Sequence, residues 1–345
     1  MPDETMLAAI FEAEGKLDVR EVLAPTIRTP QDVLLRVEAC GVCGTDIRIL
    51  AVPPAVLAKK GIVLGHEYIG HVVEVGEGVQ QFQPGDRVAV IPDVPCGDCR
   101  FCAEGRPNLC EKMYSIGGDV DGGFAQYALA SARALYKISP DLSVDEGAFI
   151  ELLSCVLGGV QKAALLPGED VAIIGAGPAG LVYMKVFQAA GAGQVIMVEV
   201  SPWRSDFARQ AGADRVINPK EQDLRQAVQA VTDGGAHVVV DAVGSQLSAA
   251  MSVARKGGRI IVFGEDHKAE CTIRPQDIQG KELRILGSFI GISVFPRAVR
   301  LLESGAVLLS SLITHRLSLT ELPAGIAELA AGRGAKGVCF PWSGV

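Results

Sequence analysis

Three residues near the N-terminal end offer a mixed set of metal ligands. Cys43 lies in the run Gly-Val-Cys-Gly-Thr-Asp (41–46), and His66 and Glu67 follow directly after Gly65. One soft sulfur, one borderline nitrogen and one hard oxygen suit a borderline cation such as zinc. Three protein ligands with a fourth position open are typical of a catalytic metal rather than a structural one. Each residue alone is more often a packing residue, so the prediction rests on the set and its flanking glycines.

Four cysteines form a second cluster, with the spacing C-x2-C-x2-C-x7-C. They are Cys96, Cys99, Cys102 and Cys110. Two-residue gaps let neighbouring thiolates converge on one tetrahedral cation, and four sulfurs close its coordination shell. An iron–sulfur cluster is the alternative, but the spacing departs from the ferredoxin patterns and no proline follows the last cysteine. The cluster therefore predicts a structural zinc that holds a loop.

A glycine-rich turn predicts a dinucleotide site. The run Gly-Ala-Gly-Pro-Ala-Gly (175–180) fits the pattern G-x-G-x-x-G, follows an apolar strand and opens a helix. Gly175 makes the turn, Gly177 lets backbone approach a pyrophosphate, and Gly180 allows close helix packing. Pro178 suits the first helical turn, and Ala179 lies at the helix N-terminus, which favours negative charge.

Glu199 ends the next predicted strand, where an acidic residue is expected to accept hydrogen bonds from the ribose hydroxyls. Its carboxylate would repel a 2′-phosphate, so the sequence favours NAD over NADP. Arg204 tempers this preference, because a nearby arginine can accept that phosphate or lie flat on the adenine. A glycine turn without any cofactor remains the alternative for the whole motif.

Two kinds of domain must position these residues. Up to residue 150, short strands with glycine punctuation, such as 6–10, 32–39, 68–75 and 87–90, predict a small β-rich domain. Residues 151–304 alternate apolar strands with helices, which is typical of a parallel sheet covered on both faces. After about residue 305 short strand signals return, and we expect residues 305–345 to rejoin the first domain. The predicted class is α/β.

The composition limits the kinds of molecule to which the protein is expected to bind. The 345 residues carry a net charge of −8, with 49% hydrophobic and 21% charged residues, as in a globular protein with a large core. An acidic chain argues against nucleic acid and anionic membranes as partners. No apolar run of membrane-spanning length and no signal peptide stand out, which predicts a cytoplasmic protein. Because cysteines stay reduced in the cytoplasm, we expect the nine cysteines to be metal ligands or buried residues rather than partners in disulfides.

Over nearly its whole length the chain resembles the zinc-dependent medium-chain alcohol and polyol dehydrogenases, in the sorbitol and threonine dehydrogenase branch. The resemblance rests on the runs 41–46, 65–67, 121–125 (Asp-Gly-Gly-Phe-Ala), 175–180 and 312–315 (Leu-Ile-Thr-His), and on the four-cysteine lobe. It implies a GroES-like β-rich catalytic domain, a Rossmann NAD-binding domain, and a homodimer or homotetramer.

The resemblance also implies roles for individual residues. Cys43 and His66 would hold a catalytic zinc, and Glu67 would be a ligand or a switching carboxylate beside it. Glu151 falls where this branch carries glutamate or aspartate, and would bind the zinc or its water. Thr45 would carry the substrate's proton outward, and Asp46 would orient His66. The weaker inference is that residues at strand ends of the Rossmann sheet contact the cofactor: Val243, Phe263, Gly264, Glu265, Ser288 and Phe289.

These expectations predict an oxidoreductase that moves a hydride from a secondary hydroxyl of a polyol, sugar or related alcohol to NAD, giving a ketone. The zinc would act as a Lewis acid on that hydroxyl. An L-threonine 3-dehydrogenase and a simple secondary alcohol or butanediol dehydrogenase are the alternatives. Arg48 argues against the threonine dehydrogenase alternative, because threonine dehydrogenases carry histidine at this position. If Arg48 lines the active-site cleft, it would favour an acidic or phosphorylated sugar as the substrate. Rivals of another class are a silent NAD(P)-binding homologue and a scaffolding homo-oligomer.

Overall fold

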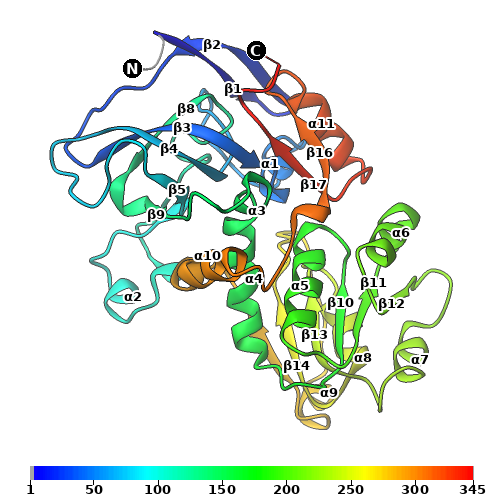
Figure 1. Ribbon diagram of the computed structural model, residues 1–345. Helices are drawn as coiled ribbons and strands as arrows, with labels where there is room; N and C mark the ends of the chain where they lie inside the picture. Colours follow the sequence, from blue (N-terminus) through cyan, green and yellow to red (C-terminus); the bar gives the residue numbers. More distant parts are fainter. Residues whose placement is uncertain (1–3, 345) are drawn as a thin grey trace. The chain divides into compact units, whose positions relative to one another are not determined.

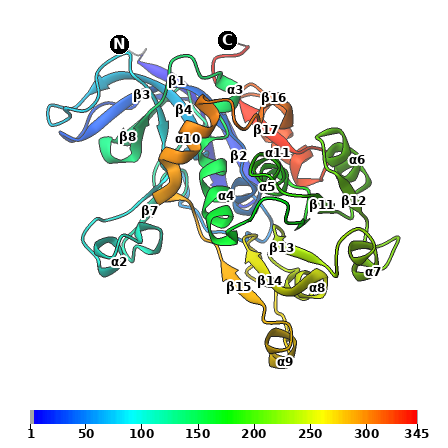
Figure 2. The ribbon, with the colours of Figure 1, turned by 60° about the horizontal axis from the view of Figure 1, so that its bottom comes forward.

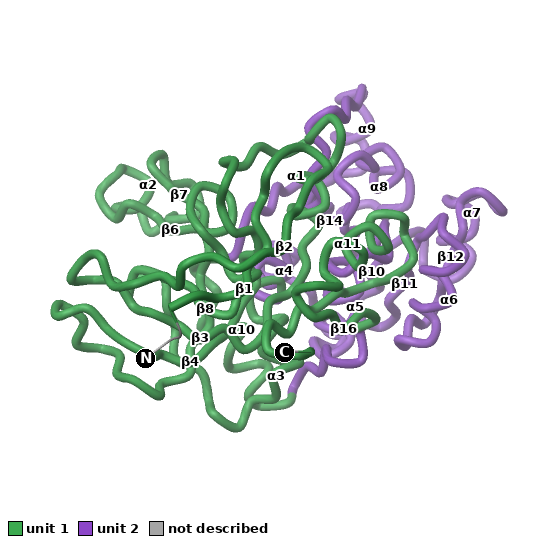
Figure 3. Tube along the Cα trace, turned by 90° about the horizontal axis from the view of Figure 1, so that it is seen from above, with its two compact units in different colours: residues 1–152, 292–305, 313–345 green, residues 153–291, 306–312 purple. Residues whose placement is uncertain are grey.

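The protein, seen in a computed structural model that describes residues 4–344, divides into two compact units (Figures 1 and 3). Unit 1 comprises residues 1–152, 292–305 and 313–345, and unit 2 comprises residues 153–291 and 306–312. Residues 1–3 and 345, which the predicted domain bounds included, lie outside the described part. Compared with the predicted bounds, residues 292–304 group with the first unit and 306–312 with the second.

The grouping of residues 292–305 has a packing reason. The ring of Phe295, in α10 (Phe295–Glu303), packs edge-on against Tyr136 at 6.2 Å. The Glu303 carboxylate accepts a hydrogen bond of 2.7 Å from the backbone N–H of Ser139. Both partners belong to unit 1, so α10 adds to the β-rich unit although it follows the parallel strands in the chain.

A mainly antiparallel sheet forms the frame of unit 1, with the strand order β16-β17-β3-β4-β5-β9 and with β8 paired to β3. The short, glycine-punctuated strands predicted from the sequence are confirmed. Its strands are β3 (Asp32–Gly41), β4 (Glu67–Val75), β5 (Arg87–Val90), β8 (Tyr127–Ser131), β9 (Leu135–Lys137), β16 (Ile313–Leu317) and β17 (Lys336–Cys339). The C-terminal strands β16 and β17 are parallel to each other, and β17 pairs antiparallel to β3. The chain end therefore completes the first unit, as predicted.

Smaller elements complete unit 1 around a core that includes Phe11, Val37, Tyr68 and Phe124. They are the hairpin β1 (Thr5–Ala13) and β2 (Lys16–Leu23), the ladder β6 (Asp93–Val94) and β7 (Tyr114–Ser115), and the helices α1 (Gly44–Ile49), α2 (Arg100–Ala103), α3 (Val144–Gly147) and α11 (Leu322–Ala330). Single 3-10 turns lie at Pro107–Leu109, Ala132–Ala134 and Ile292–Val294. Helix α4 (Ile150–Ala163) begins in unit 1 and continues in unit 2.

Unit 2 contains a six-stranded parallel sheet with the order β12-β11-β10-β13-β14-β15. Helix α8 contacts β14, as Figure 2 shows. In chain order this is 3-2-1-4-5-6, the Rossmann topology predicted from the sequence. The strands are β10 (Val171–Ile174), β11 (Val195–Val198), β12 (Arg215–Ile217), β13 (Ala236–Asp241), β14 (Ala254–Val262) and β15 (Arg284–Gly287). The helices are α5 (Pro178–Ala189), α6 (Pro202–Gln210), α7 (Leu224–Gln229), α8 (Leu247–Val253) and α9 (Pro275–Gln279), with a 3-10 turn at Ser310–Leu312.

Burial explains the apolar strands of this sheet. All four residues of β10 and of β11 are buried, because helices of crossover connections cover a parallel sheet. Strand order reverses between β10 and β13, and in such sheets ligands bind outside the carboxyl ends of the strands at this point. Among the described residues, none of the helices has the length and apolar character needed to cross a membrane.

Candidate metal centre and cofactor site

The register of two neighbouring strands brings the mixed metal ligands together. Strands β3 and β4 are antiparallel, and Gly41 lies opposite Glu67. Cys43 follows directly after β3 and caps the N-terminus of α1, while His66 precedes the first residue of β4. One potential ligand atom from each of Cys43, His66 and Glu67 lies within 4.8 Å of the others. The three residues predicted from the sequence therefore form one cluster.

Asp46 lies directly behind this cluster and is fully buried. Its Oδ2 accepts a hydrogen bond of 2.8 Å from the backbone N–H of Cys43, and its Oδ1 is 3.8 Å from His66 Nδ1. Burial raises the pKa of the Asp46 carboxyl. Burial alone would lower the pKa of His66, but the negative charges of Cys43 and Asp46 raise it well above its ordinary value. Such an anionic setting attracts a cation.

Glu67 is divided between two environments. Its Oε2 pairs with the ammonium of Lys336, and both side chains are almost completely buried. Its Oε1 is also buried and has no hydrogen-bond partner. A buried carboxylate oxygen without a partner is costly, so its position beside Cys43 and His66 fits a bound cation. Sequence analysis did not single out Lys336; its only signal was a lysine at the start of an apolar strand.

Glu151 lies close to the cluster but is not part of it. Its charge contributes to raising the pKa of both His66 and Lys336, which places it nearby. The three-residue group with converging ligand atoms does not contain it. The structure thus brings Glu151 into the neighbourhood of the metal site and leaves direct coordination by its carboxylate a prediction.

Thr45 connects the cluster with Arg48. Its Oγ1 accepts a hydrogen bond of 3.6 Å from the Cys43 thiol and one of 3.2 Å from Arg48 Nη2. Both residues lie in the six-residue helix α1, and their hydrogen bonds keep them close to the cysteine at its cap. The threonine hydroxyl is therefore in place to contact a molecule bound at the cluster, with an arginine behind it.

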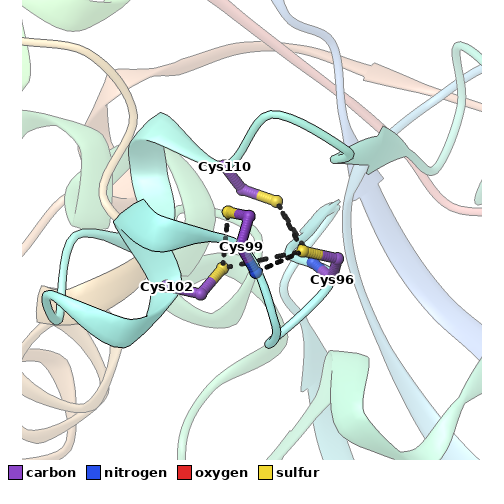
Figure 4. Close-up of side chains that lie close together, drawn as sticks. All are labelled: Cys96, Cys99, Cys102 and Cys110. Carbon is purple, nitrogen blue, oxygen red and sulfur yellow. Dashed lines mark hydrogen bonds between the residues drawn. The ribbon is translucent and has the colours of Figure 1, made fainter.

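The four cysteines of the lobe converge as their spacing predicts, and Figure 4 shows their sulfurs facing one another. The sulfur of Cys96 is 3.4 Å from that of Cys110 and 4.0 Å from that of Cys102, which is 3.6 Å from that of Cys99. Backbone hydrogen bonds lower the pKa of Cys99 to about 6, whereas a hydrogen bond with Asp98 raises that of Cys96 to about 12. Four sulfurs at these separations fit one tetrahedral zinc.

The glycine turn joins β10 to α5 as predicted. Gly175 has a φ of +100°, which favours glycine, and its N–H donates to Val198 O at 2.8 Å. A Cβ on Gly180 would collide with the Gly175 carbonyl, so close packing excludes a side chain there. A Cβ on Gly177 would meet no protein atom within 4 Å. The space at Gly177 is therefore open to a ligand, and Pro178 and Ala179 follow as the first residues of α5.

Glu199 follows β11 and is directed at this turn. Its Oε2 accepts a hydrogen bond of 2.8 Å from the backbone N–H of Ala176, and its Oε1 accepts from Val200 and Ser201. Arg204 lies in the first turn of α6, and its Nε is buried without a hydrogen-bond partner. The acidic residue predicted to bind the ribose thus also holds the turn in place.

The other predicted cofactor contacts fall into two groups. Val243 and Phe289 are 42% and 47% exposed, as expected for side chains that a ligand could cover, and Glu265 is also exposed. Phe263 instead packs edge-on against Tyr183 at 5.1 Å, and Ser288 is buried. Gly264 lies against the backbone of Gly244. The last three have packing partners in the fold, so their contact with a cofactor remains a prediction.

One buried residue in this region was missed by the sequence analysis. Asp241, at the end of β13, is fully buried. Its carboxylate accepts hydrogen bonds from the backbone N–H groups of Val243, Gly244 and Gln246. It therefore shapes the loop at the carboxyl end of the strand. A single aspartate after an apolar strand was the available signal.

Comparisons with known proteins identify the family of the chain. Residues 29–140 match the model of the alcohol dehydrogenase GroES-like domain, and residues 178–304 match that of the zinc-binding dehydrogenases. Sorbitol dehydrogenase of Bacillus subtilis (strain 168) is 33% identical over 324 residues, which cover 92% of both chains.

Solved structures show the same two-unit fold. A zinc-binding dehydrogenase of Sinorhizobium meliloti 1021, bound to NADP, is 36% identical, with a TM-score of 0.92 over 98% of this chain and 100% of its own. An alcohol dehydrogenase of Escherichia coli CFT073, complexed with NADH, is 28% identical, with a TM-score of 0.90 over 98% and 100%. The chain belongs to the zinc-dependent medium-chain alcohol and polyol dehydrogenases. Its two units are the GroES-like and Rossmann domains of that family.

Proposed function

We propose that this chain transfers a hydride from a secondary hydroxyl of a polyol, sugar or related alcohol to NAD, giving a ketone. The observation that carries the proposal is the cluster of Cys43, His66 and Glu67, with a buried, unpartnered carboxylate oxygen beside a thiol and an imidazole. A divalent metal bound there supplies Lewis-acid polarisation of the substrate hydroxyl. Sorbitol dehydrogenase among the relatives supports a polyol as the substrate.

Each residue of the site has a proposed task. Cys43 and His66 hold the metal, and Glu67 offers its free oxygen, while Glu151 binds the metal or its water. Asp46 holds the backbone of Cys43 by a hydrogen bond and places a negative charge near His66, which would help to orient the imidazole. Four cysteines of the lobe hold a structural zinc, so we expect zinc at both sites.

Thr45 is proposed to take up the substrate's proton. Its hydroxyl lies between Cys43 and Arg48, to which it is hydrogen-bonded. An arginine side chain donates hydrogen bonds and is not deprotonated in proteins, so Arg48 can hold Thr45 but cannot receive its proton. A proton that leaves Thr45 therefore needs an acceptor other than Arg48.

NAD is proposed as the cofactor because of Glu199. Its carboxylate is fixed by three backbone N–H groups next to the glycine turn, where a 2′-phosphate would meet negative charge. The relatives include one structure with NADP and one with NADH, so the cofactor class is a nicotinamide dinucleotide. We also propose a homodimer or homotetramer, in which β15, an edge strand of the described sheet, is available for pairing.

The position of Arg48 favours a second candidate class of substrate. Arg48 is linked to the cluster through Thr45, and a guanidinium binds carboxylate or phosphate in a fork. An acidic or phosphorylated sugar would be the substrate if this arginine contacts it.

The test is a substrate panel followed by the absorbance of reduced nicotinamide. Sorbitol, xylitol, butanediol, threonine and sugar acids separate the alternatives. We expect polyols to be oxidised, and Cys43→Ala and His66→Ala to lose about a thousandfold or more of the rate while NADH binding is retained. Full activity in either variant would contradict the proposal. Efficient turnover of threonine alone would establish the threonine dehydrogenase alternative.

A further inference from the structure

A buried lysine on the C-terminal strand belongs to the metal site. Lys336 is the first residue of β17 and is 1% exposed. Its ammonium pairs with Glu67 Oε2, donates to the carbonyl of Val42 at 3.1 Å, and lies 5.7 Å from the centre of the Phe149 ring. An ammonium in such a place is stable only because it is paired and hydrogen-bonded, so Lys336 and Glu67 form one unit.

The strand that leads to Cys43 leaves room for this ion pair. A Cβ on Gly41 would collide with Glu67 Oε2 and would lie 2.9 Å from Lys336 Nζ. Strand β17 pairs with β3 so that Val338 lies opposite Gly41, while β4 on the other side places Glu67 opposite the same glycine. Three strands therefore converge on one position without a side chain, and the pair occupies it.

The ion pair makes the two oxygens of Glu67 unequal. Oε2 is taken by Lys336, and Oε1 is buried without a hydrogen-bond partner. The carboxylate also belongs to the cluster with Cys43 and His66. An oxygen whose partner oxygen is bound to an ammonium donates less charge, so it binds a metal more weakly than a free carboxylate does.

We infer that Lys336 is a positioning residue for the metal: it holds Glu67 by one oxygen and so limits how strongly the other oxygen binds the ion. The inference rests on the proposed function, since it needs a metal at the mixed site. A weakly bound carboxylate leaves the metal more Lewis-acidic and its fourth position open. Lys336 thus sets the strength of the metal–Glu67 contact from a position outside the group of ligands.

Two variants at this position should act in opposite directions. Lys336→Met removes the competing cation, so Glu67 moves fully onto the metal and the ion is released more slowly. Lys336→Arg presents a planar fork that can hold both carboxylate oxygens, so Glu67 is withdrawn and the ion is released faster. Changes in partners of metal ligands typically alter affinity about 10- to 100-fold, and we expect shifts of that size.

The experiment uses the full chain with zinc in the four-cysteine lobe and cobalt in the mixed site. Visible absorption of cobalt reports the number of ligands, because it weakens when a further ligand binds. We expect weaker absorption and slower transfer of cobalt to a chelator for Lys336→Met, and faster transfer for Lys336→Arg. If Lys336→Met does not fold, cobalt release from Lys336→Arg alone tests the inference, because this variant keeps the buried positive charge.

Lys281→Met is the matched control. Lys281 is a partly buried lysine in unit 2 that donates to the carbonyls of Met251 and Ala254. Its loss should lower the melting temperature without changing cobalt absorption or release. Identical cobalt spectra and release rates in wild type, Lys336→Met and Lys336→Arg would overturn the inference about Lys336. Failure of the wild type to bind cobalt outside the four-cysteine lobe would instead overturn the proposed function.

Discussion

Glu199 accepts a hydrogen bond of 2.8 Å from the backbone N–H of Ala176 and so links the end of β11 to the glycine turn after β10. This contact fixes a negative charge beside the position proposed for the cofactor's phosphates and ribose. One residue therefore has two tasks, supporting the turn and selecting the cofactor. The two tasks can be separated by experiment.

We expect the wild type to use NAD more efficiently than NADP, and Glu199→Gln to reduce that preference. A like-charge contact costs several kcal/mol, and about 1.4 kcal/mol is a factor of ten, so the preference should exceed about tenfold. The measurement is kcat/KM for both cofactors. Asp206→Asn, which removes one exposed charge from α6, is the control and should leave the ratio unchanged. An unchanged ratio in Glu199→Gln would show that Arg204 or another residue selects the cofactor.

Alanine at two glycines of the turn should give different results. A Cβ on Gly177 meets no protein atom, so Gly177→Ala should keep the melting temperature and raise KM for NAD by about tenfold or more, because the Cβ occupies space needed by the pyrophosphate. A Cβ on Gly180 collides with the Gly175 carbonyl, so Gly180→Ala should also lower the melting temperature. Thermal melting and cofactor titration separate the two effects. Unchanged NAD binding in Gly177→Ala would place the pyrophosphate elsewhere.

The four-cysteine lobe should depend on its metal. Cys102→Ser removes one of four converging sulfurs, so we expect loss of zinc from the lobe and proteolytic cleavage between residues 96 and 112. Metal analysis and limited proteolysis measure both, and NAD binding by unit 2 should persist. Cys271→Ser is the control, since Cys271 is an exposed free cysteine. Full zinc content in Cys102→Ser would mean that the cluster does not hold the ion through this residue.

The ion pair between Glu169 and Arg259 should make stability depend on pH. Burial is the largest single influence on Glu169 and opposes its ionisation. The hydrogen bond from Arg259, at 2.5 Å, the one from the backbone N–H of Leu166 and the charge of Arg259 together outweigh burial and hold the pKa of the carboxyl below its ordinary 4.5. A carboxyl with a lowered pKa in the folded state stabilises that state above its unfolded pKa, and this contribution is lost as pH falls through the folded pKa.

Glu169→Gln should therefore lower the free energy of unfolding by about 1–2 kcal/mol at neutral pH, and the difference from wild type should disappear in acid below pH 4.5. Denaturant unfolding of the full chain at several pH values, followed by a signal from unit 2, measures this difference in the free energy of unfolding. Glu221→Gln, which removes an exposed carboxylate in the same unit, should show no such trend. A difference that stays constant into acid would assign the effect to packing rather than to charge.

Much of the molecule could be predicted from the sequence because the signals are local. The turn 175–180, the cysteines 96–110 and the alternation of strands and helices after residue 170 each depend on residues within about 15 positions of one another. The two units differ from the predicted bounds at residues 292–304 and 306–312. For the first range the reason is that α10 groups with unit 1 through contacts with Tyr136 and Ser139. Those partners lie far back in the chain, where no local pattern could show them.

The residue types specify which kinds of ligand are present: a thiol, an imidazole and carboxylates near Cys43, and four thiols in the lobe. The contact of Lys336 with one oxygen of Glu67 could not be predicted from residue types, because the two residues are 269 positions apart. They meet through the pairing of β3 with β4 and β17. The same holds for Glu199, whose carboxylate meets the turn only when β10 and β11 lie side by side. The residue type determines which bonds a side chain can form, and the strand register determines which other residues lie close enough to form them.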